Sequence, residues 1–148
     1  GLLARCPPGR VEVAIHHRIA MFHTRHCVVA SCLTRASGPP ACRRVCQTHR
    51  FELRDRIGED HPLCAGADCH LTIFASRAQS AALYVPDLVA AGVAVFRIEL
   101  LRESAEQARR LVDAYARLVA ALDDPETALA RVRAVAAAAV TTGTLDHA

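Results

Sequence analysis

Cysteine crowding is the feature that most constrains this chain. The sequence contains seven cysteines, and six of them fall between Cys27 and Cys69. In a secreted protein this density would indicate disulfides, but the count is odd and the segment from Gly1 to Gly9 lacks the apolar stretch of a secretory signal. The strand and helix patterns around the cysteines also indicate an α/β protein. We therefore expect reduced cysteines that ligate a metal in a cytoplasmic protein.

Four of the cysteines have spacings that would allow them to bind one metal site together. Cys42 and Cys46 have three residues between them and would provide two thiolates from one turn. Cys27 lies upstream and Cys69 downstream, at separations that a loop and a hairpin can fold back. Four thiolates suit either a tetrahedral zinc ion or a [4Fe-4S] cluster. The CxxC pairs common in structural zinc sites are absent, which favours the cluster, but spacing alone leaves both metals open.

Extended and helical patterns alternate along the chain. Strands are predicted at 11–15, 71–74 and 93–101, and a small hairpin from 50–55 and 61–63. Helices are predicted from about 77 to 92 with a restart at Pro86, from Ser104 to about 122, and from Asp124 until the chain unravels near Gly143. From Met21 to about Cys46 the periodicity disappears, so irregular loops are expected there.

Strands that alternate with helices predict a parallel sheet with crossover connections. The expected fold class is α/β, as a partial (β/α) barrel-like fragment with a cysteine-rich loop and a small β-hairpin inserted. We expect one domain over 1–148, with a β/α core at 11–101, the insertion at about 21–69, and C-terminal helices at 104–140. Because the chain begins with Gly1, upstream β/α units are expected. Without them, an open sheet edge would require a partner protein or self-association.

Charge gives a weaker indication of partners. The chain has no lysine, and its formal net charge of +3 is too small to indicate nucleic-acid binding by charge alone. A local group of arginines could bind phosphates or carboxylates through bidentate hydrogen bonds, or could form a solvated face: Arg43, Arg44, Arg50, Arg54 and Arg56. No run of about 18 apolar residues predicts a membrane span.

A series of motifs occurs in a fixed order between Val11 and Val119. It comprises Met21 to Cys27, Cys42 to Gly58, His61 to Leu63, Cys69, Thr72 to Phe74, Gln79-Ser80 and Phe96 to Glu99. In content and order this series resembles the signature region of peptidase family U32. The chain departs from the family pattern at three places, with Arg25 where an acidic residue is usual, His70-Leu71 where Arg-Asn is usual, and Ala75 where Asn is usual.

The resemblance implies that Cys27, Cys42, Cys46 and Cys69 bind a [4Fe-4S] cluster, as such cysteines do in several members. Some members support hydroxylation of RNA bases or of a ubiquinone precursor without molecular oxygen. The leading hypothesis is therefore a cluster-dependent hydroxylation enzyme. Its substrate, RNA or a small aromatic compound, would bind in a pocket lined by Arg43, Arg44 and Arg54. Cys6, Cys32 and Cys64 are expected to be ordinary buried cysteines.

Two other functions stay open. The family name records a collagenase-like protease, in which His23, His26, His49 or His61 would assist a metal or a water in cleaving peptide bonds. The sequence has no HExxH motif, and no cysteine is marked as a nucleophile by a fixed histidine partner, so no residue is assigned a catalytic role. The third hypothesis is a truncated, non-catalytic chain with a structural metal site.

Overall fold

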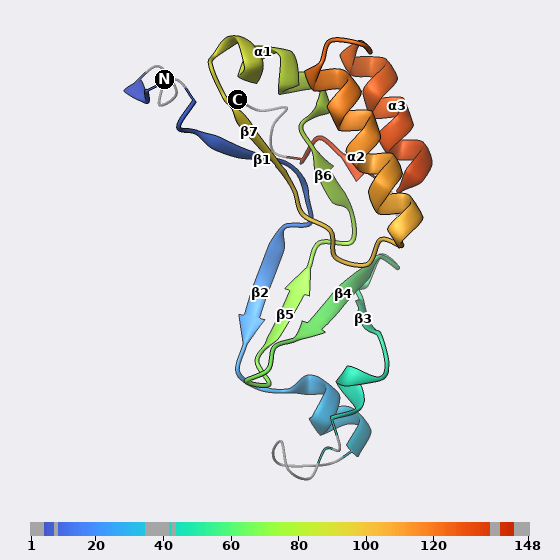
Figure 1. The fold of residues 1–148 in the computed structure, drawn as a ribbon. Helices are drawn as coiled ribbons and strands as arrows, with labels where there is room; N and C mark the ends of the chain where they lie inside the picture. The colour runs from blue at the N-terminus through green and yellow to red at the C-terminus, as the bar shows by residue number, and fades with distance from the viewer. Residues whose placement is uncertain (1–4, 8, 35–41, 43, 137–139, 144–148) are drawn as a thin grey trace. The chain divides into compact units, whose positions relative to one another are not determined.

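The structure is a computed structural model that describes residues 5–7, 9–34, 42, 44–136 and 140–143. The chain divides into two compact units. Unit 1 comprises Gly1–Arg18 and Arg77–Ala148, and unit 2 comprises Ile19–Ser76. Each unit contains its own four-stranded sheet (Figure 1).

The sheet of unit 1 has the strand order β7-β1-β6-β8. Its strands are β1 (Glu12–His17), β6 (Ala78–Ser80), β7 (Val95–Ile98) and β8 (Val140–Thr141). β1 pairs with β7, and β6 with β8, in parallel, but β1 and β6 are antiparallel. The predicted parallel sheet was therefore wrong for this pair. The chain between β1 and β6 is unit 2 instead of a crossover helix, so nothing forces β6 to run parallel to β1.

The helices of unit 1 begin where the capping residues predicted. The hydroxyl of Ser104 accepts a hydrogen bond from the Gln107 N–H, and the Gln107 side chain accepts one from the Ser104 N–H, at the start of α2 (Ala105–Val119). Asp124 caps α3 (Pro125–Val135) in a similar way. α1 (Val85–Ala90) has Pro86 in its first turn. The helix predicted from residue 77 was wrong at its start, because β6 and a 3-10 helix (Ala82–Tyr84) precede α1.

The core of unit 1 lies where α2 and α3 pack side by side and meet the sheet (Figure 1). Leu111, Tyr115 and Leu118 follow one another at helical spacing on the buried face of α2. They share one apolar cluster with Leu129 and Val132 of α3. Burial of each such side chain stabilises the folded state by about 1.5–3 kcal/mol, so this cluster holds unit 1 together.

Unit 2 is a four-stranded antiparallel sheet with the order β2-β5-β4-β3 (Figure 1). Its strands are β2 (Ala20–Thr24), β3 (Phe51–Arg54), β4 (Asp60–Ala65) and β5 (Leu71–Phe74). The predicted hairpin is confirmed as β3 and β4, and the strand at 71–74 as β5. β2 was missed, since it lies at a sheet edge and exposes most of its residues, which removes the apolar and polar alternation. A short π-helix (Ala30–Thr34) and a 3-10 helix (Val45–Gln47) complete the unit.

The α/β class is thus confirmed as a mixed architecture of two sheets and several helices, and the described residues form no closed barrel. Among those same residues, no helix has the length and apolar character needed to cross a membrane.

Candidate functional site

The register of the unit 2 sheet places Cys27 and Cys69 at the same end. β2 ends at Thr24, which pairs with Leu71 at the start of β5. Cys27 comes three residues after Thr24, and Cys69 comes two residues before Leu71. Because β2 and β5 are antiparallel, the segment after β2 and the segment before β5 leave the sheet at the same end, and these segments carry the two cysteines.

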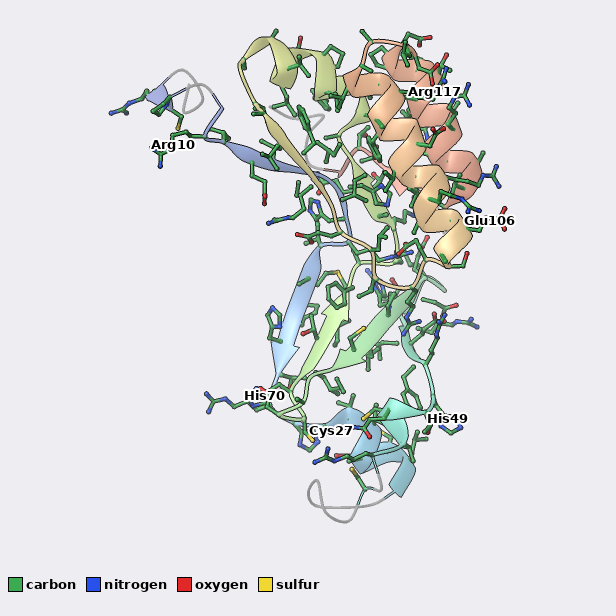
Figure 2. The ribbon with its side chains drawn as sticks, viewed as in Figure 1. Arg10, Cys27, His49, His70, Glu106 and Arg117 are labelled. Carbon is green, nitrogen blue, oxygen red and sulfur yellow. The ribbon has the colours of Figure 1, made fainter. Side chains whose placement is uncertain are left out.

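The other two cysteines of the predicted set attach to this same end. β3 begins at Phe51, which pairs with Leu63, and β4 continues from there to Ala65, the residue paired with Leu71. The segment before Phe51 therefore leaves the sheet at that end. It carries Cys46 on the 3-10 helix, which contacts β4, and Cys42 four residues earlier. We call this end of the unit 2 sheet, with the segments that carry Cys27, Cys42, Cys46 and Cys69, the cysteine end. Figure 2 shows Cys27, His49 and His70 near it.

The backbone at the cysteine end is unusual. In the described residues, only Arg44, Cys69 and Ala121 combine a side chain larger than glycine's with a positive φ. Two of these three lie at the cysteine end, with φ of 49° at Arg44 and 63° at Cys69. Left-handed backbone costs such residues about 1–2 kcal/mol and is found preferentially at functional sites.

The donor set agrees in number and type with a four-thiolate site. Cys27, Cys42, Cys46 and Cys69 are all free thiols, and Cys42 is buried. The side chains as placed do not surround one point, because no three His, Cys, Asp or Glu residues in the described ranges form a group able to hold a metal ion. The backbone thus brings the segments of the four cysteines to one end of a sheet without closing their side chains around a centre.

The remaining cysteines differ partly from expectation. Cys32 is exposed on the π-helix, so the expected burial was wrong for it, and Cys6 and Cys64 are half-buried. A π-helix of five residues on the surface of unit 2 has too little covering chain to bury every side chain it carries.

The arginines predicted to bind substrate lie in different places. Arg43 lies outside the described residues, and Arg44 is exposed at the cysteine end. Arg54 donates two hydrogen bonds to Asp60, at 2.7 and 2.8 Å, and thereby holds the pKa of Asp60 below its usual range. It ends β3, whereas the cysteines lie beyond the start of that strand. A substrate role for these arginines stays a prediction.

Three of the four histidines considered for hydrolysis lie at the cysteine end. His23 Nδ1 is 3.0 Å from the Thr72 hydroxyl, His26 Nε2 is 2.7 Å from the Ser31 hydroxyl, and His49 Nδ1 is 2.9 Å from the Thr48 hydroxyl. His61 lies away from this end, opposite Leu53 of β3. It bridges Asp55, at 3.2 Å, and the Phe74 carbonyl, at 3.3 Å, and so connects the hairpin turn to β5.

Unit 1 contains a buried polar network that the sequence analysis did not join together. The Tyr115 hydroxyl lies 2.6 Å from the Ser80 hydroxyl and 3.2 Å from His16 Nδ1. These residues are only 2%, 0% and 1% exposed, respectively. Burial lowers the pKa of His16 and raises that of Tyr115 to about 12. The signal available in the sequence was a tyrosine on the buried face of a helix, whose hydroxyl requires a partner.

The lowered pKa of His16 predicts a pH-dependent stability. As the pH falls through about 6.5, the unfolded chain takes up a proton at this ring more readily than the folded chain does, so the free energy of unfolding should fall with decreasing pH in this range. The slope from one histidine is at most about 1.4 kcal/mol per pH unit. Urea denaturation at several pH values would measure it. His16→Gln should flatten this part of the curve, and an unchanged slope would contradict the assignment.

Comparison with known proteins gives one result. The family model of peptidase family U32 matches residues 3–145, nearly the whole chain, and includes both sheets and the cysteine end. No curated protein and no solved structure matches the chain. The resemblance predicted from the motifs is confirmed. The chain therefore belongs to peptidase family U32.

Proposed function

We propose that this chain binds a [4Fe-4S] cluster through Cys27, Cys42, Cys46 and Cys69 and acts in oxygen-independent hydroxylation of RNA or of a quinone precursor. One observation carries the proposal: the register of the unit 2 sheet brings the segments of all four cysteines to one end. All four are free thiols, the form that ligates iron or zinc once deprotonated.

In such a site the cluster and the residues of the chain would have different tasks. When bound, the cluster would supply single-electron transfer. The residues of the chain would hold the substrate beside it. At the cysteine end, polar contacts for that task would come from His23, His26, His49 and the exposed Arg44.

Metal analysis of matched cysteine variants tests the proposal. After anaerobic purification, the wild-type chain should contain about four irons and four acid-labile sulfides. Cys42→Ala should lose most of both, because it removes one of four ligands from a buried position. Cys32→Ala is the control, since Cys32 lies outside the predicted set, and it should keep the wild-type content.

Other metal contents would contradict the cluster. About one zinc per chain, lost in Cys42→Ala, would identify a structural zinc site. Iron that is unchanged in Cys42→Ala would show that this cysteine is not a ligand.

A second candidate is a peptidase, and one contact favours it. The Ser31 hydroxyl lies 2.7 Å from His26 Nε2, within the range of a nucleophile and its general base. The single hydrogen of this hydroxyl can instead be donated to the Cys27 carbonyl, at 3.2 Å, and in the part of the chain that the structure describes no carboxylate bonds to the His26 ring. Gelatin cleavage that continues after all four cysteines are replaced would favour this candidate over the cluster enzyme.

A further inference from the structure

A polar pocket of about 470 Å³ opens next to the cysteine end, entirely within unit 2. Its lining combines side chains at and just after the end of β2 with side chains of the turn before β5 and of β5 itself, among them His23, Arg25, Asp68, His70 and Thr72. The lining carries a permanent cation, two imidazole rings and one carboxylate. Such a surface suits a small, charged, hydrogen-bonding ligand.

Arg25 and His70 follow directly on the last pair of the β2–β5 ladder. Thr24 pairs with Leu71, Arg25 is the residue after Thr24, His70 is the residue before Leu71, and both line the pocket. Positions 25 and 70 are also two of the places at which the chain departs from the family pattern. Within the described residues, Arg25 forms no ion pair and no hydrogen bond through its side chain. Its guanidinium is therefore available to an anion from solution.

Asp68 fixes the orientation of His70. One carboxylate oxygen of Asp68 lies 2.7 Å from His70 Nδ1, and the other accepts the His70 backbone N–H at 3.1 Å. A carboxylate only accepts hydrogen bonds, so Nδ1 carries the hydrogen, and in the neutral ring Nε2 is left as an acceptor. The turn requires glycine at position 66, because a Cβ there would lie 2.7 Å from the Asp68 oxygen that accepts the His70 backbone N–H.

We propose that this pocket binds a phosphate ester that carries a neighbouring hydroxyl. Arg25 would bind the phosphate oxygens through a bidentate pair of hydrogen bonds, and His70 Nε2 would accept the hydroxyl hydrogen. Asp68 directs both oxygens at His70, which limits its repulsion of the phosphate. The proposal uses only side chains of this pocket and does not require the cluster. A free sugar phosphate and the end of an RNA share this chemistry.

Calorimetric titration of the full chain with glycerol 3-phosphate tests the pocket. Arg25→Gln should weaken binding by about tenfold or more, because a charge-assisted bidentate contact is lost. Arg10→Gln removes the same charge from an exposed position in unit 1 and should bind like the wild type. Propyl phosphate, which lacks the hydroxyls, should bind the wild type about fivefold more weakly than glycerol 3-phosphate, and His70→Phe should bind the two probes equally.

Competition identifies the source of the ligand. A short 5′-phosphorylated RNA that displaces glycerol 3-phosphate from the wild type but not from Arg25→Gln would identify a nucleotide end, and an RNA that does not compete would identify a free phosphate ester. Wild-type affinity in Arg25→Gln, or no binding of glycerol 3-phosphate at about 10 mM, would overturn the proposal. Circular dichroism and iron content, measured for every variant, separate loss of this pocket from loss of the fold or of the cluster.

Discussion

Replacing Leu111 with alanine should lower the free energy of unfolding by about 2–5 kcal/mol. Leu111 is 0% exposed on α2 and belongs to the apolar cluster that joins α2, α3 and the unit 1 sheet. Removing its branched end leaves a cavity that the surrounding helices, held by their own packing, fill only in part. Urea denaturation followed by circular dichroism measures the change.

Val112 provides the matched control on the same helix. It is the next residue in the sequence, is 50% exposed, and lies outside the cluster around Leu111. Val112→Ala should change the free energy of unfolding by less than about 1 kcal/mol. If the two substitutions had equal effects, α2 would not bury the face that contains Leu111 and Tyr115.

The parts of the fold that could be predicted from the sequence are those with local signals. Ser104 and Gln107 form a capping box whatever the rest of the chain does, and Asp124 followed by Pro125 starts α3 equally locally. The β3–β4 hairpin was found because Phe51 and its neighbours alternate between apolar and polar side chains.

The missed elements depend on tertiary context. Ala78, Gln79 and Ser80 are all buried, so β6 shows no alternation, and its small and unbranched side chains are at least as typical of a helix. β2 fails in the opposite way, since nearly all its side chains are exposed. β1 and β6 are separated by the 58-residue unit 2, Ile19–Ser76, which permits either strand direction, so no local pattern encodes their antiparallel pairing.

The candidate site shows the same division. The ligand set Cys27, Cys42, Cys46 and Cys69 was predicted from motifs, but their placement at one end of a sheet required the register of β2 against β5 and of β3 against β4. The bond between Asp68 and His70 spans only two residues, yet many surface Asp and His residues are that close without pairing. The contact of Ser80 with Tyr115 spans 35 residues, beyond any local pattern.

Tyr115→Phe should lower the free energy of unfolding by about 1–3 kcal/mol, although it removes a single oxygen atom. The substitution leaves His16 Nδ1 without the Tyr115 hydroxyl, 3.2 Å away, and Ser80 without its 2.6 Å partner, while all three positions stay closed to water. Ser80 keeps the hydrogen bond that its hydroxyl accepts from the Ala82 N–H, so the loss should fall mainly on His16.

A double-mutant cycle separates this loss from a simple packing effect. If the Ser80 and Tyr115 hydroxyls stabilise each other, Ser80→Ala together with Tyr115→Phe should cost less than the sum of the two single changes, by about 0.5–3 kcal/mol. Strictly additive effects would mean that the 2.6 Å contact contributes no coupling. The cycle is best measured near pH 8, where His16 is neutral in both the folded and the unfolded chain, so that only the hydrogen bonds change.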